Sequence, residues 1–376
     1  MYAPAKRRTV VVLGSYAPSL LLFRASLIAE LIRQGYRVLA AAPAIGRDVR
    51  RGIEAIGAEP IEVPLANQSM SPFSAGRSLR VLTRLFREER PEAVISYTIK
   101  PVTLGSIAAA RARVPKVTAL VTGLGFAFTE GGGLKRRLSG FVAKALYRWA
   151  LRRCTSILFQ NPDDRDHFRS LGLLPPHRPV AIVNGSGIDL DHFASTPLPD
   201  RPIFLMISRL LGDKGVREYG EAAIRLKRDY PAATFRLVGY FDQSPDALRQ
   251  SELDRMISGG VEFLGKLEDV RPAIADCSVY VLPSYREGTP RSVLEAMAMG
   301  RPIITTDAPG CRETVEPGRN GLLVQPRLVY PLVQAMERFL AEPGLIHRMG
   351  HESRLLAEQK YEVTAVSRSI IAAAGL

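Results

Sequence analysis

Two glutamates flank a predicted helix start in the stretch 287-EGTPRSVLEAMAMG-300. Thr289 is a favourable N-cap residue, and Pro290 suits the first helical position because its missing N–H would have no partner there. The sequence therefore predicts a helix that begins at Pro290. Its first amide groups, which the helix dipole would direct toward an anion, belong to Arg291, Ser292 and Val293.

The carboxylates lie on both sides of this helix start, with Glu287 in the preceding loop and Glu295 in the second turn. A carboxylate only accepts hydrogen bonds, so it can take both donors of two adjacent sugar hydroxyls. Two such groups beside an anion site suit a molecule with a diphosphate between two sugars, which is a nucleotide sugar. The alternative is that Glu295 is a solvated helical residue and Glu287 a favourable charge near a helix start.

Two cations in the segment 208-SRLLGDKG-215 support the nucleotide-sugar interpretation. Arg209 and Lys214 follow a predicted strand and precede a predicted helix, where the charge of a bound diphosphate needs to be neutralised. Arginine supplies a planar fork of donors and lysine a compact charge. Fixed positive charge also stabilises a departing diphosphate in a transition state. We therefore predict that Arg209 and Lys214 are catalytic residues, and we count Glu287 with them as the acceptor at the sugar.

Short apolar runs alternate with amphipathic stretches through the whole chain, and these elements must position the charged residues. In the first half the pattern predicts strands at 9–15, 36–43, 60–65 and 92–98, and helices at 20–34, 47–56 and 76–89. In the second half it predicts helices at 215–228 and after Thr289, and strands at 202–208, 233–239, 261–265, 278–284, 302–307 and 321–326. This alternation is typical of an α/β fold with two doubly wound, Rossmann-like domains, each able to hold a nucleotide.

Glycine, serine, proline and aspartate cluster at 184–200, which favours a domain boundary in that stretch. We place residues 1–192 in an N-terminal domain that faces the acceptor and residues 193–376 in a C-terminal domain that binds the nucleotide sugar. The last helix is expected to cross back to the N-terminal domain.

Four ordered segments give the chain a family resemblance: 208–215, FLGKLED at 263–269, the long segment 281–313 and GRNGLLV at 318–324. Together they resemble the retaining GT-B nucleotide-sugar glycosyltransferases of family 4, and the resemblance covers nearly the whole chain. It implies two Rossmann-like domains that face each other across a cleft.

The resemblance also implies a role for individual residues. Glu287 would contact the hydroxyls of the donor sugar, and Glu295 would hold the ribose. Arg209 and Lys214 would bind the diphosphate. We expect the donor site to include the residues around the helix start as well, namely Thr289, Pro290, Arg291, Ser292 and Val293.

The first half departs from the family pattern at two places. Many relatives carry a glycine pair in the first loop, where this chain has Gly14 followed by Ser15, and we expect these two residues to approach the donor. Many relatives also carry a histidine near 121–125, and this chain has none there. The departing diphosphate is then expected to help deprotonate the acceptor. Lys100 and Thr122 are candidates for facing the acceptor, with an ordinary surface lysine as the alternative for Lys100.

Three segments in the first half, at 19–27, 97–109 and 121–132, look like transferases that extend sugars on a polyprenyl-diphosphate carrier for O-antigen, capsule or exopolysaccharide assembly. The expected reaction is transfer of a hexose or N-acetylhexosamine from a nucleotide sugar, with UDP favoured over GDP. The alternatives are a nucleotide-sugar epimerase of the same architecture and a GDP-mannose-dependent mannosyltransferase.

Charge is distributed unevenly along the chain. Residues 1–195 hold 28 Lys and Arg against 14 Asp and Glu, whereas residues 196–376 hold 23 of each. A basic half points to a polyanionic partner. Nucleic acid is not expected, because aromatic residues do not interleave with the basic ones. The segment 134–153 predicts a basic amphipathic helix that attaches peripherally to an anionic membrane, with Trp149 in the protein core.

No metal or other cofactor is expected. The DxD spacings at 164–166 and 189–191 do not follow a strand in the setting that holds a divalent cation on a diphosphate. Cys154, Cys277 and Cys311 show no paired spacing, so neither a disulfide framework nor a zinc site is indicated, and a reducing cytoplasm fits. No apolar window reaches the roughly 18–20 residues needed to cross a bilayer. We therefore expect a cytoplasmic protein at the inner face of the cell membrane.

Overall fold

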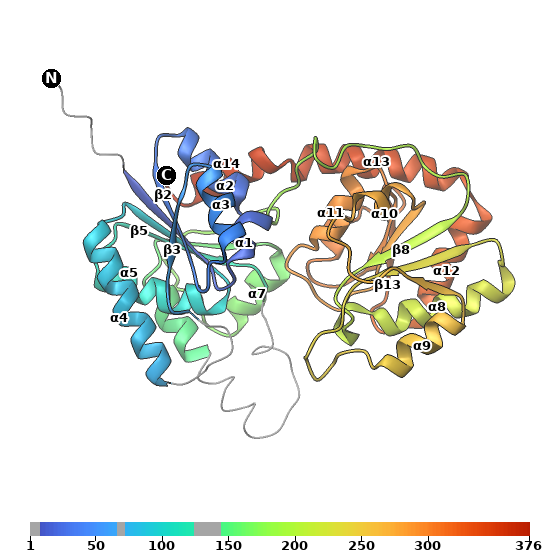
Figure 1. The fold of residues 1–376 in the computed structure, drawn as a ribbon, viewed down its shortest axis with the longest axis horizontal. Coiled ribbons are helices and arrows are strands. Elements are labelled where there is room, and N and C mark those ends of the chain that lie inside the picture. The colour runs from blue at the N-terminus through green and yellow to red at the C-terminus, as the bar shows by residue number, and fades with distance from the viewer. Residues whose placement is uncertain (1–7, 66–71, 124–143) are drawn as a thin grey trace. The chain divides into compact units, whose positions relative to one another are not determined.

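The computed structural model describes residues 8–65, 72–123 and 144–376, and it contains two compact units (Figure 1). Unit 1 comprises Met1–Ser186 together with Thr364–Leu376, and unit 2 comprises Gly187–Val363. The division after Ser186 lies within the stretch 184–200 and slightly before residue 192. The C-terminal segment groups with unit 1.

Unit 1 is built on a seven-stranded parallel sheet with the strand order β3-β2-β1-β4-β5-β6-β7. The strands are β1 Thr9–Leu13, β2 Arg37–Ala42, β3 Glu59–Glu62, β4 Ala93–Tyr97, β5 Lys116–Val121, β6 Ser156–Phe159 and β7 Val180–Ile182. β1 is central, since Val11 is in register with both Leu39 and Val94. All five residues of β1 are buried, because a central strand of a parallel sheet is covered on both faces.

The sequence pattern does not predict β5, β6 or β7, which extend this sheet beyond β4. β6 has four residues and β7 has three, so neither gives a run long enough to be distinguished from a short buried helix. β5 is long enough to be recognised, since five of its six residues are buried and apolar or β-branched. Its omission is an error of pattern assignment.

Helices cover both faces of the first sheet (Figure 1). They are α1 Pro18–Leu22, α2 Ala25–Arg33, α3 Arg47–Ala55, α4 Pro72–Glu89, the π-helix Pro101–Gly105, α5 Ser106–Arg111, α7 Pro162–Ser170 and α14 Val363–Ala373. Val10 and Val12 contribute to the core on one face, and Val11 and Leu13 to the core on the other. This alternation follows from the two-residue period of a strand.

The single helix predicted at 20–34 is wrong, because the chain breaks between α1 and α2 at Phe23 and Arg24. Arg24 is buried, and its guanidinium lies 4.9 Å from the centre of the Tyr97 ring. An apolar period alone cannot indicate such a break, since it depends on a residue from β4.

The predicted basic helix at 134–153 lies partly outside the described residues, and the described part is helical at residues 144–151. Trp149 is 38% exposed, so the expectation of a core position is wrong. The buried residues are Tyr147, Ala150 and Leu151 instead. Tyr147 fixes the rotation of the helix, because its ring packs edge-on against Phe168 with centroids 5.2 Å apart.

Unit 2 is built on a six-stranded parallel sheet with the order β10-β9-β8-β11-β12-β13. The strands are β8 Ile203–Ile207, β9 Thr234–Val238, β10 Val261–Phe263, β11 Val279–Leu282, β12 Ile303–Thr306 and β13 Gly321–Val324. The sequence pattern predicts all six to within a few residues at each end. β8 is paired with β9 along its length and with β11 through Phe204 and Leu205.

The helices of unit 2 are α8 Val216–Asp229, α9 Gln250–Ser258, α10 Arg271–Ala275, α11 Arg291–Ala298, α12 Val329–Ala341 and α13 Gly344–Tyr361. Short 3₁₀-helices lie at Gly212–Lys214 and Arg312–Thr314. α11 begins at Arg291 with Pro290 as the N-cap, one residue later than predicted. Pro290 has an extended backbone with ψ of 109°, which is outside the helical region.

A fully buried arginine ties the start of unit 2 to its core. Arg301 donates to the carbonyl oxygens of Ile274, Ala275, Thr196, Pro197 and Met299, and to the Thr196 hydroxyl, at distances of 2.7 to 3.0 Å. Burial lowers the pKa of its guanidinium, so the charge is tolerated only because these acceptors replace water. The chain before β8 is thereby fixed to the segments that precede β11 and β12.

Candidate active site

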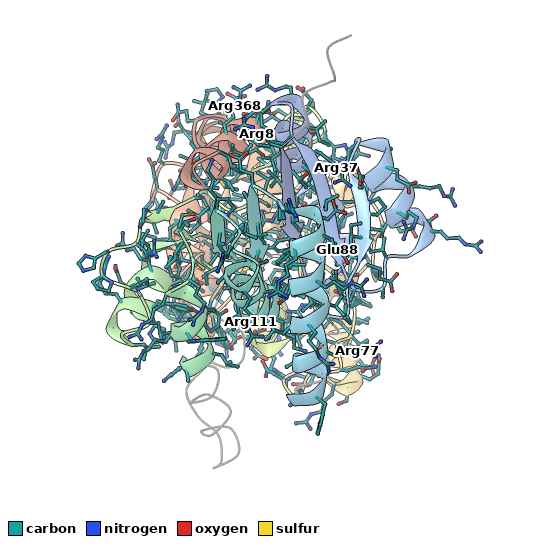
Figure 2. All side chains as sticks on the ribbon, turned by 90° about the vertical axis from the view of Figure 1, so that its left-hand side faces the viewer. Arg8, Arg37, Arg77, Glu88, Arg111 and Arg368 are labelled. Atoms are coloured by element: carbon teal, nitrogen blue, oxygen red, sulfur yellow. The ribbon has the colours of Figure 1, made fainter. Side chains whose placement is uncertain are left out.

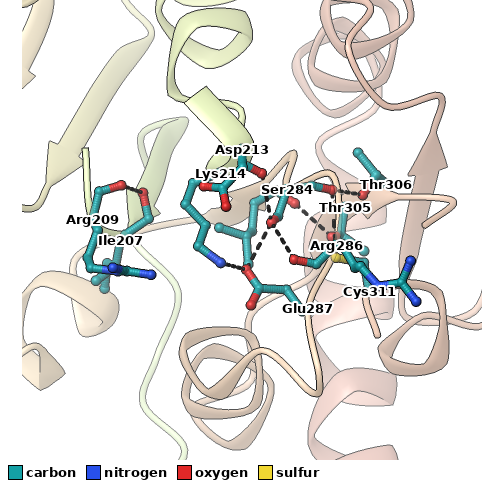
Figure 3. Close-up of polar contacts among 12 residues, drawn as sticks. Ile207, Arg209, Asp213, Lys214, Ser284, Arg286, Glu287, Thr305, Thr306 and Cys311 are labelled. Carbon is teal, nitrogen blue, oxygen red and sulfur yellow. Dashed lines mark hydrogen bonds and ion pairs between the residues drawn. The ribbon is translucent and has the colours of Figure 1, made fainter. Parts of the chain in front are cut away.

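The candidate site lies in unit 2, at the point where the strand order of its sheet reverses between β8 and β11. In a doubly wound sheet, ligands bind outside the carboxyl ends of the strands at such a point. The segment 208–215 follows β8, and the segment 283–290 follows β11. The two predicted motifs therefore meet at the same edge of the sheet, and Figure 3 shows the residues that they contribute.

Lys214 and Glu287 form an ion pair at the centre of this site. The Lys214 Nζ lies 2.6 Å from the Glu287 Oε1, and the two side chains are only 14% and 18% exposed. Burial acts to lower the pKa of Lys214, but the charge of Glu287 and its hydrogen bond outweigh burial, and the pKa is raised. The ammonium therefore stays charged at neutral pH.

Ser284 holds Glu287 from the other side. Its hydroxyl donates to the same Glu287 Oε1 at 2.9 Å, so one carboxylate oxygen accepts from both Lys214 and Ser284 (Figure 3). Ser284 is fully buried just after the end of β11. Sequence reasoning missed Ser284, because a single serine after a strand carries no distinctive pattern.

A tight turn brings Lys214 into this position. Gly215 adopts φ of 73°, a left-handed conformation that favours glycine, and it ends the 3₁₀-helix that contains Lys214. A side chain at Gly215 would also clash with the carbonyl oxygen of Pro283. The turn after β8 can therefore pack directly on the chain that leaves β11.

Arg209 is the second predicted cation, and a carboxylate from the loop after the neighbouring strand β9 restrains it. The Arg209 Nη1 lies 2.8 Å from the Asp242 Oδ2, with the arginine side chain 46% exposed. Asp242 in turn accepts from the backbone and the hydroxyl of Ser244, at 2.8 and 2.6 Å. The Ser244 hydroxyl hydrogen bond, with smaller effects from the Ser244 amide and Arg209, holds the pKa of Asp242 below its ordinary value.

Asp246, in the same loop after β9, stabilises the turn before Lys214. Its carboxylate accepts from the Asp213 amide at 2.7 Å, and its carbonyl oxygen accepts from the Gly212 amide at 3.0 Å. The loop after β9 thus supports both cations of the segment 208–215. Sequence reasoning missed Asp242 and Asp246, since only the pairing of β8 with β9 brings them there.

The start of α11 differs in detail from the prediction. The Val293 amide donates to the Pro290 carbonyl oxygen at 3.1 Å, so the expectation that Val293 offers a free amide to a ligand is wrong. The helix tightens at its first turn, as helix termini commonly do. Pro290 takes the N-cap position that the sequence assigns to Thr289.

Glu295 and Arg291 form an ion pair within α11, with 3.1 Å between the Arg291 Nε and the Glu295 Oε1. The Glu295 side chain is 13% exposed, and burial raises its pKa although Arg291 opposes the shift. Glu295 is therefore a largely buried hydrogen-bond acceptor, and the alternative that it is a solvated helical residue is wrong. Ser292 is half-buried in the first turn of α11, and the buried Val293 and Leu294 next to it pack the helix against the sheet.

The candidates in unit 1 gather at the carboxyl ends of neighbouring strands. Gly14 and Ser15 follow β1, Lys100 follows β4, and Thr122 follows β5. β1 is paired with β4, and β4 with β5, so the four residues share one edge of the sheet. Lys100 is partly buried, and desolvation lowers its pKa. This edge is also a reversal point of strand order.

Gly14 has a structural reason to be glycine. A Cβ at this position would clash with the Tyr97 hydroxyl, which hydrogen-bonds the Ser19 hydroxyl at 2.8 Å. The Ser15 hydroxyl bonds that of Thr98 at 2.7 Å and links the ends of β1 and β4. Where many relatives have a second glycine, this chain therefore has a serine that hydrogen-bonds Thr98.

Residues 8–65, 72–123 and 144–376 contain no group of three or more His, Cys, Asp or Glu side chains arranged to hold a metal ion. Cys154, Cys277 and Cys311 are buried thiols. Desolvation raises the pKa of each thiol, to about 11 or 12, so none is a thiolate at neutral pH. The expectation that the reaction needs no metal or cofactor stays a prediction.

Comparison with known proteins connects this geometry to an activity. Residues 201–342 match the family described as Glycosyl transferases group 1, and residues 23–185 match the Glycosyl transferase 4-like domain. The chain is 31% identical to the N,N'-diacetylbacillosaminyl-diphospho-undecaprenol alpha-1,3-N-acetylgalactosaminyltransferase of Campylobacter jejuni, over 77% of this chain and 78% of that protein. It is 27% identical to the UDP-Gal:alpha-D-GlcNAc-diphosphoundecaprenol alpha-1,3-galactosyltransferase of Escherichia coli, over 73% of each chain.

Solved structures agree on the fold. The Anabaena protein HepE in complex with UDP matches with a TM-score of 0.76 at 19% identity, covering 97% of this chain and 98% of that one. Two parallel Rossmann-like sheets with these neighbours define the GT-B class of glycosyltransferases. The sequence identity to the relatives, the two domain matches and the fold lead to one conclusion: the chain belongs to the group 1 and GT4-like glycosyltransferases and is a hexosyltransferase.

Proposed function

We propose that this hexosyltransferase moves a hexose or an N-acetylhexosamine from a UDP-sugar to a sugar linked to polyprenyl diphosphate, with retention at the anomeric carbon, in surface polysaccharide assembly. Two relatives support the acceptor class, since their names specify sugars on diphospho-undecaprenol. The name of the second relative specifies a UDP-sugar donor. The observation that carries the proposal is the Lys214–Glu287 pair at the β8–β11 reversal point.

The donor diphosphate would bind between Lys214 and Arg209. An ammonium group has three N–H donors, and Lys214 uses one for Glu287, which leaves donors for a phosphate oxygen. Arg209 offers a planar fork beside it, held by Asp242. Because both cations are restrained before the ligand arrives, they stabilise the charge that develops on the departing diphosphate without reorganising first.

Glu287 would accept hydrogen bonds from the donor sugar, and Glu295 would accept from the ribose. Ser284 and Lys214 fix the position of the Glu287 carboxylate, so adjacent hydroxyls meet a rigid acceptor. The segment from Thr289 to Ser292 would complete the donor site beside the phosphates.

The residues of unit 1 would act on the acceptor side. Lys100 and Thr122 lie at the edge where β4 and β5 end, and the pKa of Lys100 is lowered by desolvation. Gly14 and Ser15 would approach the donor from the first loop. The segment 121–125 contains no histidine, so the departing diphosphate is proposed to take the acceptor proton on the same face of the sugar.

The test of this proposal is a transfer assay on the full chain. The protein is incubated with UDP- and GDP-sugars and with a short-chain polyprenyl-diphosphate sugar, and the product is identified by mass and its anomeric configuration by NMR. We expect transfer from a UDP-sugar with an α linkage and no turnover in Glu287→Ala. Full activity of Glu287→Ala would refute the donor site. Conversion of a UDP-sugar in the absence of acceptor would indicate an epimerase instead.

We also propose peripheral attachment to an anionic membrane through the segment 134–153. Within the described part of the chain, no helix is long and apolar enough to cross a bilayer. Leu146 and Trp149 are exposed, and the Arg153 guanidinium lies 3.9 Å from the Trp149 ring centre. Rising salt concentration should release the protein from anionic vesicles, because salt screens exposed charges. Retention at high salt would contradict an electrostatic attachment.

A further inference from the structure

A row of arginines follows one face of α4 in unit 1. The row comprises Arg77, Arg80, Arg84 and Arg87, separated by three, four and three residues, which is the spacing of neighbours on a helix face. All four side chains are exposed. The opposite face packs into the core through Leu82 and Phe86. We call these four residues, together with Arg111 at the end of α5, the arginine ridge.

The ridge is a connected surface. Arg80, Arg84, Arg87 and Arg111 line one depression together with Thr83 and Glu88. Figure 2 shows Arg77 and Glu88 toward opposite ends of α4 on the side of unit 1 that faces the viewer. With a rise of about 1.5 Å per residue, the row from Arg77 to Arg87 is about 15 Å long. That length exceeds a single phosphate or diphosphate and suits an extended anionic surface.

Most of this charge is not neutralised by the protein. Arg84 pairs with Glu88, with 2.7 Å between Nε and Oε1. Arg77, Arg80 and Arg87 form no ion pair with any residue in the described ranges. Each exposed arginine without a carboxylate partner adds to the positive potential outside the helix. The ridge is therefore a local source of the basic excess of the first half of the chain.

An aromatic residue extends the same face of the helix. Phe73, in the first turn of α4, lies one turn before Arg77 and is 90% exposed. Val81, next to Arg80, is also exposed. The apolar face of α4 stays in the protein core, so at a membrane Phe73 would offer one ring to the interface and the arginines would bind the acidic headgroups.

We infer that the arginine ridge and Phe73 form a docking surface for an anionic lipid membrane, separate from the segment 134–153. The inference rests on the proposed lipid-linked acceptor, which requires the enzyme to work at a membrane. Nucleic acid is a poorer fit to the same charge, because Phe73 lies at one end of the row and Phe86, which lies between Arg84 and Arg87 in the sequence, is buried in the core and offers bases no ring to stack on. The proposed partner is thus the anionic headgroup surface of a lipid membrane.

The test compares two triple variants of the full chain. One is Arg77→Gln/Arg80→Gln/Arg87→Gln, which removes the three unpaired charges that the ridge carries on α4. The matched control is Arg201→Gln/Arg228→Gln/Arg348→Gln, which makes the same change of net charge at exposed positions of unit 2. Binding is measured by co-sedimentation with vesicles of phosphatidylcholine that contain or lack phosphatidylglycerol.

We expect the ridge variant to lose about a hundredfold in partition onto the anionic vesicles, since each basic residue near such a surface contributes about fivefold. The control should stay close to the wild type. Equal loss in both variants, or wild-type partition of the ridge variant, would overturn the inference. The inference would also be overturned if the ridge variant bound RNA more weakly than the wild type but kept its partition onto the anionic vesicles.

Phe73→Ser provides a second arm that leaves the charge unchanged. A side chain that is already exposed contributes little to folding, so the variant should fold normally and bind the anionic vesicles more weakly. Transfer to a water-soluble acceptor should be unchanged in all variants. A chain that docks through the ridge but has no transferase activity on lipid-linked sugars would refute the proposed function and leave the docking surface standing.

Discussion

The cations of the proposed donor site and the arginine ridge use similar residue types in opposite settings. Lys214 is buried against Glu287, and Arg209 is held by Asp242. Arg80 and Arg87 of the ridge are exposed and form no ion pair within the described residues. Carboxylates therefore restrain Lys214 and Arg209, whereas no carboxylate of the described residues restrains Arg80 or Arg87.

The two settings suit different ligands. A restrained cation has lost its conformational freedom before binding, so it can direct its N–H groups at one diphosphate and favour one geometry. An exposed arginine samples many rotamers and responds to the average field of a surface, which has no single geometry to recognise. The net charge of a region thus says less about its ligand than the carboxylate partners of its cations do.

Lys214 gives the largest test of this comparison. Lys214→Met removes the buried charge and the ion pair at 2.6 Å, while Glu287 keeps its hydrogen bond from Ser284. We expect kcat/KM with a water-soluble acceptor to fall about 10²–10³-fold, as for loss of a preorganised group that stabilises charge in a transition state. Arg80→Met, the counterpart on the ridge, should keep the kcat/KM of the wild type. Similar losses in both variants would break the distinction between the two sets of cations.

Substitution of Asp242 should reduce kcat/KM less than substitution of Lys214, because Asp242 acts only by positioning Arg209. In Asp242→Asn the arginine loses its anchor at 2.8 Å but keeps its charge. We expect a roughly fivefold loss of kcat/KM, expressed mainly in the KM for the nucleotide sugar, since an exposed restrained pair is worth on the order of 1 kcal/mol.

A double-mutant cycle separates positioning by Asp242 from general damage. In the Arg209→Met background, Asp242→Asn should cost almost nothing, because the side chain that it restrains is gone. Equal costs of Asp242→Asn in both backgrounds would show that Asp242 does not act through Arg209.

Local patterns in the sequence predict much of the scaffold. All six strands of unit 2 follow from short apolar runs between turn residues, and the cations at 209 and 214 follow from their place between a strand and a helix. Glu287 and Glu295 are likewise identified by their distance from a helix start. The break at Arg24 and the rotation of the helix at 144–151 are different, because contacts with Tyr97 and Phe168 from other elements determine them.

The partners of the site residues could not be predicted for the same reason. Ser284 reaches Glu287 across a short loop, and Asp242 reaches Arg209 because β9 lies beside β8. Such contacts depend on which strands are neighbours, and no spacing within either segment encodes that order. The sequence therefore indicates which chemical groups a site contains, but it does not indicate which neighbouring residues restrain them.

Glu88 offers the smallest test, and it is one that should strengthen binding. Glu88 is the acidic residue in the depression of the ridge, and its side chain is 59% exposed while paired with Arg84. An exposed pair of this kind contributes about 0.2–1 kcal/mol, so Glu88→Gln should change the free energy of unfolding very little. It removes one negative charge from the ridge and releases Arg84, which should raise partition onto anionic vesicles about fivefold, or about 1 kcal/mol. Glu342→Gln is the matched control, because Glu342 forms the same type of helical pair with Arg338 in unit 2. A rise in both variants would reflect net charge alone, whereas a rise in Glu88→Gln only would require the ridge to face the lipid.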